Sequence, residues 1–197
     1  MKKVNNIFEK VVTPENFYLA YELAKRGKRN SYGVRKFERN LESNLEALRQ
    51  SLINNTYSTG EYHIFVKFTP KERIIYRLHF PHRVVHHALM NILEPIWVSV
   101  FTKDTYSCIK GRGIHATVRA VKSALKDKEN TQYCLKLDIS KFYPSIDHEA
   151  LKSIVRRKIK DQRVLEILDE VIDSAPGVPI GNYLSQYFAN LYLAYFD

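Results

Sequence analysis

Apolar side chains recur every three or four residues over most of this chain, the spacing that places them on one face of a helix. A threonine, a proline and an acid at positions 13–15 predict the start of one helix, which ends near Gly27. A second apolar stripe predicts a helix from Val34 to about Asn54. Its members are Phe37, Leu41, Leu45, Leu48 and Leu52. Both stripes indicate core-forming helices in the N-terminal part.

The same spacing predicts further helices at about 80–93, 116–126, 148–160 and 164–174, and from Ser185 onward. The first of these is expected to be interrupted at Glu94-Pro95, because proline lacks the amide hydrogen that an inner helix position uses. Asp147 directly precedes an amphipathic run. It is therefore predicted to cap the following helix.

Three short segments alternate instead, as strands do. Residues 62–67 and 73–78 predict a β-hairpin around a turn at 69–72. Residues 133–139 predict a strand with Cys134, Lys136 and Asp138 on one face, leaving a leucine- and isoleucine-rich face for the core. Because Asp138 ends this strand before a tight aromatic turn, it is a candidate ligand for a divalent cation beside a polyphosphate, although most lone strand-end aspartates are turn formers.

Composition and charge point to a folded chain with a polyanionic partner. The chain has 197 residues, 45% of them hydrophobic, a formal net charge of +10 and a pI near 9.5. This size suits one or two domains, and the charge favours nucleic acid before membrane as a partner. The two cysteines, Cys108 and Cys134, suggest neither a disulfide framework nor a zinc knuckle. No segment has the length of a membrane span, so a cytoplasmic location is expected.

The cations gather in two places. Seven lysines and arginines lie between residues 25 and 39, beside Tyr32 and Phe37. They form either a solvated face or a track for a nucleic acid backbone. Lys71 and Arg73 at the predicted hairpin turn either protect a sheet edge or cradle a triphosphate. A glycine-flanked arginine, Arg112, could also approach a phosphate closely.

His82 and His86 stand four residues apart, the spacing of a zinc pair on one helical face. The metalloprotease pattern requires a glutamate after the first histidine, and Arg83 stands there. A buried histidine, or one that faces nucleic acid, is therefore the preferred interpretation.

Residues 137–148 (LDISKFYPSIDH) resemble the first palm motif of bacterial reverse transcriptases. Residues 180–186 (IGNYLSQ) resemble the second block as diversity-generating retroelement enzymes carry it, rather than the commoner Pro-Gln-Gly form of group II intron and retron relatives. Residues 71–73 (KER), 83–96 and 104–113 match further family positions in order. The resemblance covers essentially the whole chain.

This resemblance implies an α+β fold: mostly helical fingers at 1–132 with the β-hairpin, and the first part of a right-hand polymerase palm at 133–197. It also implies a role for particular residues. Asp138 and the Ile139 carbonyl would hold Mg²⁺, of which the complete enzyme uses two ions. The incoming nucleotide would contact Lys71, Arg73, Phe142, Tyr143, Ile180, Gly181 and Gln186.

The implied partners are an RNA template, a DNA primer, a deoxynucleoside triphosphate and a retroelement accessory protein. The family's Tyr-x-Asp-Asp hairpin does not occur before Asp197, so this polypeptide alone is predicted to be inactive. The open edge of the strand at 133–139 is predicted to recruit a second copy. By analogy with the retroelement group, copying would be error-prone.

Two other classes remain open. A non-catalytic, basic RNA-binding protein could keep the fingers and half of a palm as a scaffold. A metal-dependent nuclease using Asp138 and Asp147 would need a carboxylate cluster that the sequence does not show.

Overall fold

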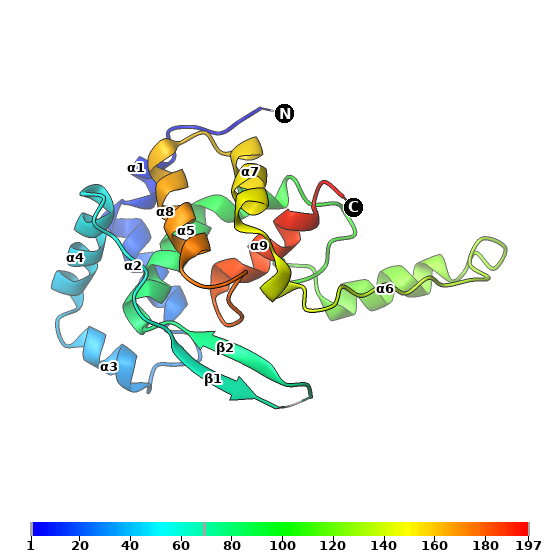
Figure 1. Ribbon diagram of the computed structural model, residues 1–197, viewed down its shortest axis with the longest axis horizontal. Helices are drawn as coiled ribbons and strands as arrows, with labels where there is room; N and C mark the ends of the chain where they lie inside the picture. Colours follow the sequence, from blue (N-terminus) through cyan, green and yellow to red (C-terminus); the bar gives the residue numbers. More distant parts are fainter. Residues whose placement is uncertain (1, 69, 197) are drawn as a thin grey trace.

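The computed structural model describes residues 2–68 and 70–196. Within them helices dominate and one antiparallel pair of strands forms a sheet, so the α+β class predicted from the sequence is confirmed (Figure 1). In chain order the elements are α1 (Phe8–Val11), α2 (Pro14–Ala24), α3 (Tyr32–Glu38), α4 (Leu41–Ile53), β1 (His63–Lys67), β2 (Arg73–Arg77), α5 (Phe80–Val98), α6 (Ile114–Ala124), a 3₁₀ turn at Tyr143–Ser145, α7 (His148–Lys158), α8 (Gln162–Asp173) and α9 (Tyr183–Leu193).

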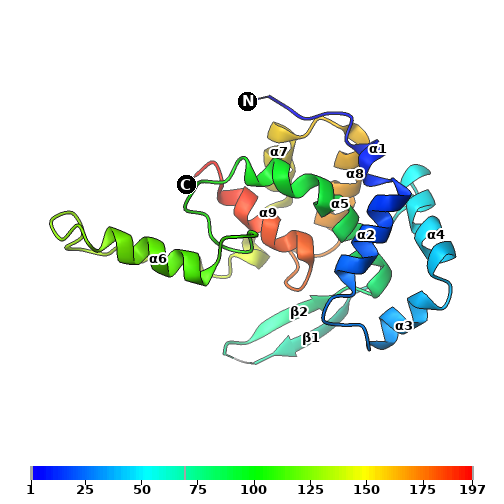
Figure 2. The ribbon, with the colours of Figure 1, turned by 180° about the vertical axis from the view of Figure 1, so that it is seen from behind.

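Helix α5 runs through the middle of the molecule, with α2 packed on one side and α9 on the other (Figures 1 and 2). The predicted interruption at Glu94-Pro95 is wrong, because α5 continues to Val98. Pro95 lies on the exposed side of the helix, and it removes only one backbone hydrogen bond. Leu93 and Trp97 are fully buried on either side of it, and their packing holds the helical path.

The N-terminal segment is tied to the C-terminal part of the chain. Val4 forms a parallel bridge with Ile159, and the Asp161 carboxylate accepts hydrogen bonds from the amides of Ile7 and Phe8 at 2.7 and 2.9 Å. Buried side chains from both sides of residue 132 belong to one core cluster. The core is therefore continuous across that position.

The single helix predicted from Val34 to about Asn54 is wrong in one respect. The structure has two helices, α3 and α4, with a break at Arg39-Asn40. The backbone of Asn40 leaves the helical region (φ −135°, ψ 55°). The Asn44 side chain donates to the Phe37 carbonyl at 2.8 Å, and this bond satisfies one of the groups that the break sets free.

The hairpin and the helix caps agree with the sequence pattern. Strands β1 and β2 pair antiparallel, with His63 opposite Arg77 and Lys67 opposite Arg73. The predicted turn at 69–72 includes Thr69, which lies outside the described residues. The Asp147 side chain accepts from the Ala150 amide at 2.8 Å, so its predicted role as the cap of α7 is confirmed.

The strand predicted at 133–139 is not formed. These residues are irregular, and they run back beside α6 in an arm that projects from the body (Figures 1 and 2). The side chains expected in the core, Leu135 and Leu137, are 82% and 80% exposed. A strand requires a neighbour for its backbone hydrogen bonds, and within the described residues none pairs with this segment.

Candidate functional site

The loop at residues 176–181 holds β2 and the Tyr143 turn together. At one end the Tyr76 amide donates to the Ile180 carbonyl at 2.8 Å. At the other end the Val178 amide donates to the Tyr143 carbonyl at 2.9 Å. Because both bonds involve the backbone, one loop fixes the hairpin and the aromatic turn relative to each other.

Two glycines allow this loop to approach so closely. A Cβ on Gly181 (φ +122°) would lie 2.7 Å from the Tyr76 carbonyl oxygen. A Cβ on Gly177 (φ +59°) would lie 2.5 Å from the Tyr143 carbonyl oxygen. Both contacts involve backbone, which cannot turn aside. The glycines of this block are therefore required by backbone geometry and by close packing.

The loop lies between β2, which carries Arg73, and Tyr143. Burial raises the pKa of the Tyr143 hydroxyl, and the positive charge of Arg73 acts in the opposite direction. The Phe142 ring packs 5.8 Å from the Tyr143 ring and 6.3 Å from that of Tyr192 on α9. The Phe142 ring thus connects the Tyr143 turn to α9.

The remaining predicted nucleotide contacts lie around this centre. Ile180 is half-buried in the loop, and Gln186 is exposed on α9. The loop is further held by Ser185, whose hydroxyl donates to the Pro179 carbonyl at 2.6 Å. Lys71 is exposed at the hairpin turn. Backbone hydrogen bonds thus hold β2, Ile180 and Tyr143 together, and the side chains of Lys71, Arg73 and Gln186 are exposed.

Asp138 and Ile139 precede the Tyr143 turn in the chain. Both belong to the irregular segment beyond α6, and both are exposed. Among the described residues, no hydrogen bond or ion pair joins the Asp138 carboxylate to another side chain.

The residues at hand do not fit a magnesium ion by themselves. Mg²⁺ prefers an octahedral set of oxygen ligands and is usually held through one or two carboxylates plus phosphate groups. Between residues 2 and 196, Thr69 excepted, no three histidine, cysteine, aspartate or glutamate side chains gather as a metal site would require. Asp147 is engaged as a helix cap, so Asp138 remains a single exposed carboxylate.

Two other sequence candidates have structural roles. Arg112, expected near a phosphate, donates to the carbonyls of Thr102 and Thr105 at 2.8 and 3.0 Å, and so closes its own loop. His86 is buried, as the preferred interpretation held. His82 is half-buried, and its ring packs 5.8 Å from that of Tyr57.

Sequence reasoning missed one feature, a basic cavity of about 970 Å³. The sequence shows the cations of the 25–39 segment as a cluster, but it does not indicate that Arg77 and Arg83 line the same cavity. Arg77 ends β2 and Arg83 lies on α5, about 50 residues or more from Lys28 along the chain. No local spacing could reveal that the fold brings them beside Lys28.

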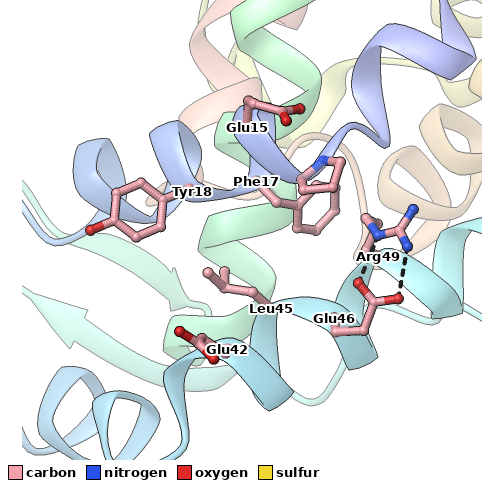
Figure 3. Close-up of a pocket in the computed structure, with 8 residues that line it drawn as sticks. Glu15, Phe17, Tyr18, Glu42, Leu45, Glu46 and Arg49 are labelled. Atoms are coloured by element: carbon pink, nitrogen blue, oxygen red, sulfur yellow. Dashed lines mark hydrogen bonds and ion pairs between the residues drawn. The ribbon is translucent and has the colours of Figure 1, made fainter.

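A second cavity, of about 480 Å³, lies between α2 and α4 (Figure 3). Phe17 and Leu45 form its apolar floor, and an ion pair between Arg49 and Glu46 closes one side. It contains none of the predicted site residues.

Comparison with known proteins decides the family. Residues 66–197 match the family described as reverse transcriptase (RNA-dependent DNA polymerase). The chain belongs to this reverse transcriptase family. The matched range includes β2, the Tyr143 turn and the loop at 176–181.

Relatives of this reverse transcriptase chain include bacterial and plant proteins. It is 30% identical to Protein YkfC of Escherichia coli over 58% of its length, and 24% identical to Group II intron-encoded protein LtrA of Lactococcus lactis subsp. cremoris over 79%. It is 27% identical to Nuclear intron maturase 1, mitochondrial, of Arabidopsis thaliana over 46%. These alignments cover 34%, 28% and 12% of the relatives, so the chain spans about a third of them or less.

Within residues 2–68 and 70–196 of this chain, no helix combines the length and apolar character that crossing a bilayer requires.

Proposed function

We propose that this chain supplies the fingers (1–132) and the first part of the palm (133–197) of an RNA-directed DNA polymerase. In that role it would help to add deoxynucleotides to a DNA primer on an RNA template. The observation that carries the proposal is that one loop joins β2, which bears Arg73, to the Tyr143 turn through two backbone hydrogen bonds. A cation and an aromatic ring on two elements joined in this way suit a nucleoside triphosphate.

In this proposal, each group of residues contacts a different part of the nucleotide. Arg73, with Lys71, would hold the triphosphate, because guanidinium forks grip phosphate oxygens in pairs. Tyr143, supported by Phe142, would pack beneath the deoxyribose. Ile180, Gly181 and Gln186 would form the floor under the base and sugar. Asp138 and Ile139 would contribute oxygens to Mg²⁺ only together with further carboxylates, and we assign no step to the metal here.

The retroelement subtype is part of the proposal. Residues 180–186 carry the Ile-Gly-x-x-x-Ser-Gln form, which supports a diversity-generating enzyme with low fidelity and an accessory protein. The relatives found bear names of intron-encoded proteins and maturases, which support the wider class. A cytoplasmic location fits the two free cysteines, both exposed.

Primer extension tests the proposal. In a chain extended past Asp197 to include a Tyr-x-Asp-Asp segment, Asp138→Ala should abolish incorporation while RNA binding persists. The matched control is Asp147→Ala, which removes an aspartate nine residues away that caps α7. It should keep incorporation. Equal activity of the two variants would contradict the proposal.

A non-catalytic RNA-binding protein is the second candidate, favoured by the basic cavity. It predicts that the extended chain binds RNA and incorporates nothing, with or without Asp138. The 197-residue chain itself should show no incorporation under either function. Robust incorporation by it would overturn our expectation that additional metal ligands are needed.

A further inference from the structure

A series of side-chain hydrogen bonds connects the base of the β-hairpin to the end of the loop at 176–181. Asn182, which follows that loop, donates through Nδ2 to the Tyr62 hydroxyl at 2.8 Å. Tyr62 directly precedes β1, and its hydroxyl lies 2.7 Å from the Ser174 hydroxyl. Ser174 directly follows α8 and donates to the Val171 carbonyl at 2.7 Å. Tyr62 therefore joins segments that are far apart in the sequence.

The direction of each bond follows from the hydrogens that are available. A serine hydroxyl has one hydrogen, and that of Ser174 goes to the Val171 carbonyl. Tyr62 must therefore donate to Ser174, and its oxygen is left to accept from the Asn182 amide. The three bonds run in one direction, from Asn182 to α8. Removal of the Tyr62 hydroxyl breaks two of them at once.

Asn182 lacks the local role that is usual at its position. It is buried and stands immediately before α9, where an asparagine side chain ordinarily accepts from the first amides of the helix. Its side chain forms no such cap. Its Oδ1 atom is buried without a hydrogen-bond partner among the described residues. An unpaired buried acceptor costs stability, so the stability of α9 does not explain this arrangement. Departures from local rules are expected where a residue serves a site.

The second strand of the hairpin is attached to the same loop. The Tyr62 ring meets the ring of Tyr76 on β2 edge to face at 5.6 Å. The Tyr76 amide donates to the Ile180 carbonyl at 2.8 Å. One side-chain bond and one backbone bond thus connect the hairpin to neighbouring positions, Asn182 and Ile180. Two attachments define an orientation, whereas a single one acts as a hinge.

The segment before β1 is also anchored to α8 without any help from the loop. The Glu170 carboxylate accepts from the Thr59 amide at 2.7 Å and from the Ser58 hydroxyl at 3.1 Å. Loss of the Tyr62 hydroxyl therefore leaves this segment attached to α8. What it releases is the link between the hairpin and Asn182.

We propose that Tyr62 and Asn182 are positioning residues that hold the hairpin in a fixed orientation over the loop at 176–181. The inference rests on the proposed function, in which the hairpin bears Arg73 for the triphosphate and the loop forms the floor under the base and sugar. Without the side-chain bond, an incoming deoxynucleotide has to order these two surfaces as it binds. Such ordering reduces the affinity for the nucleotide.

Steady-state primer extension by the chain extended past Asp197 tests this role. Tyr62→Phe keeps the ring against Tyr76 and removes only the hydroxyl. It should raise KM for the deoxynucleotide about tenfold and leave kcat within about twofold, because the lost interaction serves binding. A purely structural role would reduce the fraction of folded enzyme, which lowers kcat at constant KM. That result would overturn the proposal.

The matched control is Tyr57→Phe, which removes a hydroxyl from the same segment. The Tyr57 hydroxyl lies 3.4 Å from Nδ1 of His82 on α5, away from the loop. This variant should keep both kinetic parameters. An equal rise of KM in Tyr57→Phe and Tyr62→Phe would show that the bond to Asn182 is not responsible.

Asn182→Ala tests the other end of the bond. It should raise KM to a similar extent as Tyr62→Phe. The double variant should be no worse than either single variant, because both remove one interaction. Effects that multiply would mean that the two residues act separately, and would overturn the shared role.

Hydrogen exchange of the 197-residue chain distinguishes failure of this inference from failure of the proposed function. Tyr62→Phe should speed exchange of the Tyr76 amide about tenfold and leave α5 unchanged, whereas Tyr57→Phe should alter neither. If the extended parent chain incorporates nothing, the proposed function fails and the exchange rates alone decide whether Tyr62 holds the hairpin. Unchanged exchange at Tyr76 would overturn the positioning role in either case.

Discussion

His86 illustrates how burial of a single side chain can make the stability of this protein depend on pH. It lies fully buried on α5, and neither ring nitrogen has a hydrogen-bond partner. Burial lowers its pKa to about 3, and the neighbouring His82, His87 and Arg83 act in the same direction. Burial and nearby cations also lower the pKa of His87 to about 4, and its ring stacks 4.4 Å from that of Tyr183.

We expect these histidines to make the protein acid-sensitive. The unfolded chain binds a proton at each imidazole near pH 6.5, whereas folded His86 resists it until about pH 3. Stability is therefore full above pH 6.5 and falls as the pH drops toward 3. The substitution His86→Leu removes this proton-linked cost. Relative to the parent, it should therefore raise the free energy of unfolding by about 2 kcal/mol more at pH 5 than at pH 7. Urea unfolding at the two pH values measures this.

The control for that experiment is His115→Leu, which removes an exposed histidine on α6. It should change stability equally at both pH values. If His86→Leu behaved in the same way, the assignment of acid sensitivity to burial would be wrong.

Gly177 gives a second prediction at the residue scale. Gly177→Ala adds a Cβ against the backbone of Tyr143 and Pro144 at a positive φ, and should cost about 3 kcal/mol. Gly27→Ala has a similar φ of +69° but meets nothing within 4 Å, so it should cost only about 1 kcal/mol. Urea unfolding of both variants separates steric contact from backbone strain. Equal costs would refute the close approach of this loop to the Tyr143 turn.

At the scale of elements, α6 differs from every other long helix described here. It has no buried residue, and its apolar side chains Ile114, Val118 and Val121, like that of the capping Leu125, are all exposed. Helix α5, by contrast, is buried along most of its length. A helix without tertiary packing is marginally stable in water.

Hydrogen exchange should reveal this difference. We expect protection factors in α6 to be at least about 100-fold lower than those in α5, because α6 can open without disturbing the core. Measurement at several protein concentrations also tests the predicted pairing of chains through residues 133–139. Protection of the arm that rises with concentration would support such pairing, and strong protection in a monomer would contradict the exposed arm.

At the scale of the whole molecule, Asp161 connects the N-terminal segment to the start of α8. It caps α8, and it also accepts from the amides of Ile7 and Phe8 in buried surroundings. Asp147 caps α7 in the same way, but through a single exposed hydrogen bond. The two aspartates thus share one local role and differ in their long-range contacts.

Asp161→Ala should cost about 3 kcal/mol, because it leaves buried amide groups without acceptors. Asp147→Ala should cost about 1 kcal/mol, the usual value of an exposed cap. Urea unfolding gives the two values, and limited proteolysis should show faster cleavage near residues 2–8 in the first variant alone. Similar costs and cleavage would mean that the N-terminal segment is held by its apolar contacts instead.

The sequence determined most local structure of this protein. The helical stripes, the capping role of Asp147 and the β-hairpin follow from spacing and turn chemistry, which act between near neighbours. The motifs around Tyr143 and Gly181 were readable for the same reason, since each is a short run. Local signals failed at Asn40 and Pro95, where long-range packing settled whether a helix breaks or continues.

Tertiary structure determined which distant segments pair with or lie close to one another. Residues 133–139 have the alternation of a strand, but a strand forms only when another segment accepts its backbone hydrogen bonds. The link between β2 and the Tyr143 turn, and the shared cavity of Lys28, Arg77 and Arg83, depend on loops that close over dozens of residues. No spacing along the chain encodes such proximity, because it arises only when the core around α5 has been assembled.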